Sequence, residues 1–169
     1  MTSKNIQSKR AEAERFSGRA RSIWSGVFFG LGFVAFIDEV VFHQLLHWHH
    51  FYDKSTSGIG LVSDGLFHAF SWFATLAAFF MMSDLRRKRE LSLTSWWGGM
   101  LVGGGGFQLY DGIIQHKLME IHQIRYNVNL TPYDLTWNII AVAMILAGIY
   151  LIILGKSART KRTEGHRHA

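Results

Sequence analysis

The side chains best suited to chemistry are histidines and acids that lie inside or just beside long apolar stretches. Seven of the nine histidines fall within residues 38–68 and 111–138, and most of the acids accompany them. Neutral imidazole together with carboxylate is a donor set that suits zinc, copper, iron or manganese. We therefore predict a metal site drawn from ten residues: Asp38, His43, His47, His49, Asp64, His68, Asp111, His116, His122 and Asp134.

Within this set, some residues have a more specific expected role. Asp64 and Asp111 are the candidates for ligating a metal or acting as a base, and His43 and His116 are the candidates for binding a cofactor. That cofactor is one or two ions of copper, iron or zinc, or alternatively a haem b held between two imidazoles. The chain has no cysteine, which rules out disulfides and thiolate metal sites.

The polar pattern occurs twice along the chain. A shift of 73 residues aligns residues 24–49 with residues 97–122 without a gap and gives eight identities. Composition alone would give about two identities. The shared polar residues follow the pattern D-x4-H-x5-H, which comprises Asp38, His43 and His49 in the first copy and Asp111, His116 and His122 in the second. The repeat predicts that the two copies form equivalent halves of one structure.

Glycines also recur at matched positions, as Gly26 and Gly30 in the first copy and as Gly99 and Gly103 in the second. Small residues four apart let helix backbones approach closely in lipid. We expect the helices that carry them to contact each other near the cytoplasmic side.

Continuous α-helices, at 100° per residue, would divide the polar residues of each copy into two stripes. In the first copy Glu39, His43, His47 and His50 would form one stripe, and Asp38 and His49 the other. In the second copy the stripes would be Gln108, Asp111, Gln115 and His122, and then His116 and Glu120. The same geometry predicts that His43, His68 and His116 meet at one depth.

The elements that must position these side chains are four apolar stretches, each long enough to cross a bilayer, which takes about 20 helical residues. They lie near residues 23–48, 61–82, 95–118 and 133–154, within a transmembrane domain of residues 23–155. A basic arm, residues 1–22, precedes the domain and a basic tail, residues 156–169, follows it. Backbone groups in lipid must be satisfied internally, so we expect an all-α four-helix bundle made of two tandem helical hairpins in parallel repeat.

Charge sets the expected orientation. The net charge of +6 could by itself suggest binding to nucleic acid, but the placement of the charges argues against it. Fifteen of the eighteen Lys and Arg residues lie in the arm, the tail and the connection near residue 87. The positive-inside rule then places both termini in the cytoplasm, with the histidines near the outer leaflet. We predict a multi-pass protein of the plasma membrane whose partner is the lipid bilayer and not nucleic acid.

Four runs of sequence carry a resemblance: IDEVVFHQLLHWHHFYD, SDGLFHAF, YDGIIQHKLMEIHQIRY and PYDLTWN. They resemble a bacterial family of four-span predicted membrane proteins of unknown function, over nearly everything between Gly30 and Asn138. The resemblance implies the fold, bacterial origin and the shared polar residues, and it supplies no reaction. One departure is that Glu39 follows the first motif aspartate, where Gly112 follows Asp111. The histidine clusters also look like the His boxes of membrane di-iron desaturases and hydroxylases, as an analogy only.

These observations favour a metal-dependent oxidoreductase or hydrolase that acts on a small or lipidic substrate. Non-enzymatic binding or delivery of metal, such as copper for respiratory complexes, and a bis-His haem b protein stay open as alternatives. Proton or ion transport along the Asp and His side chains is a further alternative. Four spans are few for a transporter, although a homodimer would supply more.

Overall fold

The computed structural model describes residues 3–165, and it describes side chains for residues 16–156. Within these residues every regular element is helical, as the sequence predicted. The elements are α1 (Ser3–Asp38), η1 (Glu39–Leu45), α2 (Ser57–Arg87), α3 (Leu93–Tyr110), η2 (Asp111–Leu118) and α4 (Thr131–Gly165), where η1 and η2 are π-helical extensions of α1 and α3. From residue 3 onward, α1 also includes the residues of the expected basic arm.

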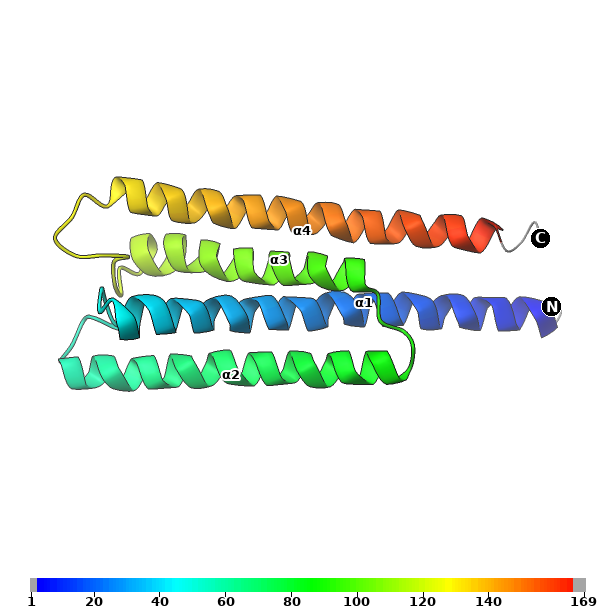
Figure 1. Cartoon of the computed structure of the whole chain (residues 1–169), viewed down its shortest axis with the longest axis horizontal. Coiled ribbons are helices and arrows are strands. Elements are labelled where there is room, and N and C mark those ends of the chain that lie inside the picture. The colour runs from blue at the N-terminus through cyan, green and yellow to red at the C-terminus, as the bar shows by residue number, and fades with distance from the viewer. Residues whose placement is uncertain (1–2, 166–169) are drawn as a thin grey trace.

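The central pair of the fold is α1 and α3, with α2 packed on the outside of α1 and α4 packed on the outside of α3. The four long helices consequently stand in the order α2, α1, α3, α4 in Figure 1. The four helices thus form a row built around a central pair. The first turn of α1 and the last turn of α4 lie at one end of the row, and the connections 46–56 and 119–130 lie at the other (Figure 1).

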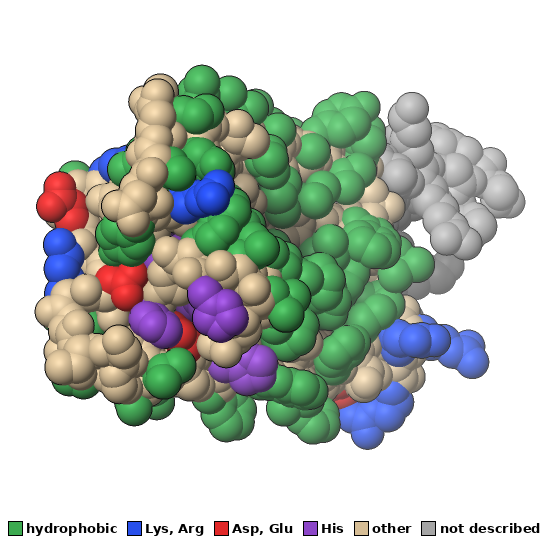
Figure 2. Space-filling view, turned by 60° about the vertical axis from the view of Figure 1, so that its left-hand side comes forward, with side chains coloured by type: hydrophobic (Ala, Val, Ile, Leu, Met, Phe, Trp, Pro, Cys, Tyr) green, Lys and Arg blue, Asp and Glu red, His purple; other side chains and the backbone are tan. Residues whose placement is uncertain are grey.

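Three helical stretches are long and apolar enough to cross a membrane: Phe16–Leu45, Ser57–Arg87 and Thr131–Lys156. The fourth predicted span, residues 95–118, is not among them. Its helix is rich in glycine and then continues into the polar segment Asp111–Leu118, so its apolar character is diluted. In Figure 2 hydrophobic side chains form a broad belt, and histidine and acidic side chains gather beside it.

The contact between α1 and α3 is made backbone to backbone at the matched glycines. A Cβ atom added at Gly30 would collide with the carbonyl of Met100, and one added at Gly103 would collide with the carbonyl of Val27. These two contacts are related by the same shift of 73 residues. Gly26 and Gly99 make a second reciprocal pair of this kind. The contact predicted from the small-residue spacing is therefore present.

Replacement of Gly30 by leucine should weaken the central helix pair, because the new side chain has no space against the Met100 carbonyl. We expect a loss of about 1–3 kcal/mol in the free energy of unfolding, as for other overpacked sites. Gly103→Leu should give a similar loss. The measurement is unfolding in mixed detergent micelles.

The matched control is Gly65→Leu, since an added Cβ at Gly65 meets nothing within 4 Å. Equal stability of the Gly30 and Gly65 variants would contradict the role given to the glycine contact.

Candidate metal centre

The central helices change from α-helical to π-helical geometry where they reach the polar residues. Hydrogen bonds in a π-helix span five residues instead of four, so side chains five apart come to the same side. That spacing separates Asp38 from His43 and Asp111 from His116. The prediction that Asp38 and His43 lie on different stripes was therefore wrong, because it assumed a continuous α-helix. The prediction that Asp111 and His116 lie on different stripes was wrong for the same reason.

The chain then reverses in the same way in both halves. His47 has a φ of 51° and the matching Glu120 has a φ of 49°, an uncommon conformation for residues other than glycine. The amide of Trp48 donates to the carbonyl of Phe42 at 2.9 Å, and the amide of Ile121 donates to that of Gln115 at 3.0 Å. This turn ends the helix at Leu45, before the predicted end at residue 48, and carries the next histidine back toward the helix axis.

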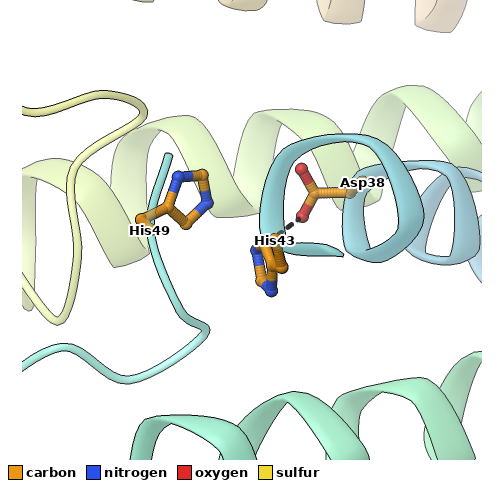
Figure 3. Close-up of side chains that lie close together, drawn as sticks. All are labelled: Asp38, His43 and His49. Atoms are coloured by element: carbon orange, nitrogen blue, oxygen red, sulfur yellow. Dashed lines mark ion pairs between the residues drawn. The ribbon is translucent and has the colours of Figure 1, made fainter. Parts of the chain in front are cut away.

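The first half thereby assembles Asp38, His43 and His49. Figure 3 shows His43 beside Asp38 on the helical turn and His49 approaching from the connection that follows. The Asp38 Oδ2 and His43 Nε2 atoms lie 3.7 Å apart, and the ring centroids of His43 and His49 lie 4.5 Å apart. All three side chains are buried, and one potential ligand atom from each lies within 4.8 Å of the others.

The second half assembles Asp111, His116 and His122 in the same way. The Asp111 carboxylate has one oxygen 3.2 Å from His116 Nε2 and the other 3.3 Å from His122 Nε2. The rings of His49 and His122 stack at 4.6 Å with an interplanar angle of 3°. The two groups therefore adjoin and form one buried cluster of six ligand-type side chains, which we call the six-residue cluster.

Each half orients a histidine of the other half. His49 Nδ1 donates to the carbonyl of Ile124 at 3.0 Å, and His122 Nδ1 donates to the carbonyl of Phe51 at 2.9 Å. A carbonyl only accepts, so both Nδ1 atoms carry the proton, and the Nε2 atom presents a lone pair wherever the imidazole is neutral. Burial, and then the neighbouring imidazole of His122, lower the pKa of His49 to about 2. His49 is therefore neutral at physiological pH.

Asp64 of α2 fixes His43. Its Oδ1 accepts from His43 Nδ1 at 3.1 Å and from the Phe51 amide at 2.7 Å, while its Oδ2 lies 2.6 Å from His50 Nδ1. Both oxygens are thus engaged, so the geometry suits orientation of histidine better than a free base. Glu39 Oε2 lies 2.8 Å from the same His43 nitrogen, and Glu39, His43 and Asp64 form a third group that could hold an ion.

In the second half, Asp134 of α4 takes the place of Asp64 with a looser contact. One of its oxygens lies 3.9 Å from His116 Nδ1, and the other lies 2.5 Å from Lys117 Nζ. Asp134 therefore lies beside the six-residue cluster without being part of it.

The ring nitrogens that face the interior have no hydrogen-bond partner. The Nε2 atoms of four histidines are buried without one: His43, His49, His116 and His122. Buried polar atoms are almost always paired, so unpaired atoms need an explanation. Four such atoms next to two buried carboxylates form a donor set for metal ions.

Besides Asp64 and Asp134, two further predicted ligands, His47 and His68, do not join the six-residue cluster. His47 is exposed, since the reversal of the chain at this residue turns it away from the interior. His68 is half-buried on α2, where its ring lies 5.7 Å from the ring of Phe36. His68 belongs to none of the described groups that could hold an ion, although Asp64 of the same helix bonds to His43. His50, which bonds to Asp64, was absent from the predicted set, although it ends the histidine run 47–50.

A polar pocket of about 380 Å³ lies over the six-residue cluster at the outer end of the molecule. It is lined by His47, Trp48, His49, His50, Asp53 and Tyr126. Because His49 belongs to both, the pocket adjoins the six-residue cluster.

A family model described as "Predicted membrane protein (DUF2243)" matches residues 25–155. This range includes the central helix pair and the whole six-residue cluster. It confirms the resemblance seen in the sequence. No curated protein and no solved structure matches the chain.

Replacement of Asp64 by leucine should destabilise the fold, because His43 Nδ1, His50 Nδ1 and the Phe51 amide would lose their acceptor. We expect a loss of roughly 3 kcal/mol in the free energy of unfolding, since buried donors would be left unsatisfied. Asp53→Leu is the matched control, because Asp53 is half-exposed and accepts one bond, from the His50 amide. Equal unfolding midpoints for the two variants would contradict the role given to Asp64.

Proposed function

We propose that this chain, which belongs to the family of predicted membrane proteins matched over residues 25–155, is a metalloprotein with two transition-metal ions in one buried centre. One ion is held by Asp38, His43 and His49, and the other by Asp111, His116 and His122. The observation that carries the proposal is the convergence of four buried, unpaired Nε2 atoms on this region.

The energetic argument starts from the cost of the six-residue cluster without a cation. Each buried polar atom left unpaired costs about 1–3 kcal/mol, and carboxylates inside a membrane protein are costly as well. Asp38 and Asp111 are both buried and carry like charge when ionised. Bound cations would offset both costs at once, whereas apolar packing would offset neither.

The donor atoms also suit metal ions by their spacing and type. Separations of 3.2 and 3.3 Å between Asp111 oxygens and imidazole nitrogens fit around an ion with bonds of about 2.0–2.1 Å. Imidazole and carboxylate donors without thiolate favour iron, copper(II) or zinc. Three protein ligands per ion leave a coordination position for another molecule, as in catalytic sites.

Metal of this kind supplies Lewis-acid or redox chemistry when bound. We propose that the protein is a metal-dependent oxidoreductase or hydrolase acting on a small or lipidic molecule. Within it, Asp111 serves as a ligand, while Asp64 and the two carbonyl acceptors hold the imidazoles in position. Three protein ligands per ion and a fully enclosed donor set support this assignment.

We also propose that the centre lies near the outer leaflet of a bacterial inner membrane, with both termini in the cytoplasm. The support is that the first turn of α1, the last turn of α4 and the basic connection near residue 87 lie at one end of the row, and the metal centre at the other (Figure 1). Basic residues concentrate on the cytoplasmic side of membrane proteins.

Metal delivery is the second candidate function, and the polar pocket over His49 favours it. An outward-facing pocket suits the capture of an ion such as copper for a respiratory complex. Burial of the ligands argues for a resident ion instead, since His43, His116 and His122 are each 1% exposed. Haem b between His43 and His116 has less support, because the stacked rings of His49 and His122 lie among the same imidazoles.

The metal content of purified variants tests the proposal. Wild-type protein from metal-replete cells, purified without chelators, should carry about two ions per chain, given three protein ligands per ion. The double variants Asp38→Ala/His49→Ala and Asp111→Ala/His122→Ala should each retain about one, because each removes two ligands of one ion. Elemental analysis per mole of protein gives the result.

His47→Ala and His68→Ala are the matched controls, since neither side chain reaches the six-residue cluster. Wild-type protein with less than about 0.2 equivalents of every transition metal would refute the proposal, because a site with this donor set should remain loaded.

The rate at which bound metal is lost distinguishes the two candidate functions, catalysis and metal delivery. A resident catalytic metal should survive dialysis against EDTA, because its ligands are enclosed, while a delivered ion should be lost quickly through the polar pocket. Elemental analysis before and after dialysis is the measurement. Rapid and complete loss from the wild-type protein would favour delivery over catalysis.

A further inference from the structure

A second cavity, of about 640 Å³, lies within the apolar zone on the side of α1 where α2 and α3 flank it. We call it the lateral cavity. Val27 and Leu31 of α1 contribute to its lining. Its rim includes Leu66, Phe70 and Tyr110, which are exposed at the surface that faces lipid. It therefore opens sideways toward the bilayer and not toward water.

One end of the lateral cavity is polar. Gln115 lines it and is 3% exposed, yet its Oε1 atom is buried without a hydrogen-bond partner. The other polar group deep in the lining, the Ser63 hydroxyl, already donates to the Gly60 carbonyl and accepts from the Tyr52 amide. An unpaired buried acceptor in an apolar cavity is satisfied by a ligand that brings a donor.

The polar end lies beside the proposed metal centre. Phe51 and Phe67 line the lateral cavity and also contact the cluster, with ring centroids 6.2 Å from His122 and 5.7 Å from His43. Gln115 itself directly precedes His116. A head group hydrogen-bonded to Gln115 would therefore sit one aromatic ring away from the imidazoles.

The two halves of the molecule differ at this cavity. At the shift of 73 residues, Gly106 and Gln115 of the second half correspond to Phe33 and Phe42 of the first. Phe42 packs against Trp48 at 5.2 Å and against Trp137 at 5.6 Å, so aromatic rings fill the corresponding place. An added Cβ at Gly106 meets nothing within 4 Å. The flank with the small and amide residues is thus open at the positions where the first half has aromatic rings.

From these observations we infer that the lateral cavity binds a bilayer-dissolved molecule with a long hydrocarbon chain and a hydroxyl head group. The chain lies along the apolar wall between Val102 and Gln115, which spans roughly 20 Å at the helical rise per residue. The hydroxyl donates to Gln115 Oε1. That this molecule is the substrate of the metal centre rests on the proposed function, whereas its binding does not.

Photolabelling of the full-length protein in nanodiscs tests the inference. The probe is a long-chain primary alcohol with a diazirine in mid-chain, and the comparison probe is the matching alkane. Wild-type protein should be labelled by the alcohol at lateral-cavity residues. Gly106→Phe, which restores the residue type of the first half, should reduce this labelling about tenfold by filling the open space.

Gly65→Phe is the matched control, because it adds the same ring at an exposed position of α2 that does not line the cavity. It should leave labelling unchanged. Gln115→Leu should reduce labelling by the alcohol roughly three- to tenfold, the value of one lost hydrogen bond, and should leave alkane labelling unchanged.

Two outcomes would overturn the inference. One is equal labelling of the Gly106→Phe and wild-type proteins. The other is equal labelling of the wild-type protein by the alcohol and the alkane, which would mean that an ordinary acyl chain occupies the lateral cavity. Metal content measured on the same samples separates the proposals: loaded protein without hydroxyl-dependent labelling refutes the lipid site alone, and labelled protein without metal refutes the metal centre alone.

Discussion

An imidazole nitrogen inside a membrane protein needs a partner, because neither lipid nor apolar side chains can accept or donate a hydrogen bond. In this protein the Nδ1 atoms of His43, His49 and His122 bond to a carboxylate or to carbonyls of the chain, and Asp134 lies near that of His116. The Nε2 atoms of these four histidines have no hydrogen-bond partner and lie in one buried region that also contains Asp38 and Asp111. The remaining architecture can be read as the means of holding these six side chains in place.

The central helix pair provides that support. Glycine contacts bring α1 and α3 together backbone to backbone, and the π-helical segments then turn Asp and His toward a common side. The connections add the last histidine of each half and the carbonyl that orients the histidine of the other half. Neither half contains a complete set of oriented ligands, so the centre depends on both. The outer helices contribute Asp64 and Asp134 behind His43 and His116.

Much of the site could be predicted from the spacing D-x4-H-x5-H, since all six residues of the cluster belong to its two copies. The arrangement within it could not, because a spacing of five separates side chains on an α-helix and only the π-helical turn brings Asp38 and His43 together. The position of His68 outside the cluster could not be predicted, because its spacing one turn from Asp64 says nothing about which helix α2 packs against. The helical class and three of the spans followed from apolar length, whereas the fourth predicted span, residues 95–118, is not among the helices apolar enough to cross a membrane, because α3 is rich in glycine. Gln115 entered the sequence analysis only as a member of a polar stripe, because the cavity that it lines cannot be inferred from spacing.

The contacts between the two halves are reciprocal. Gly30 of the first half contacts Met100 of the second, and the matching Gly103 of the second contacts the matching Val27 of the first. Two separate copies of a single hairpin would make the same contacts by associating about a twofold axis. Joining them in one polypeptide frees each copy to change without altering the other. The two halves have diverged in this way. Phe42 of the first half packs against Trp137, whereas the matching Gln115 of the second half lines the open lateral cavity. Covalent linkage thus lets a symmetric core carry an asymmetric surface, with one side sealed and the other accessible from the bilayer.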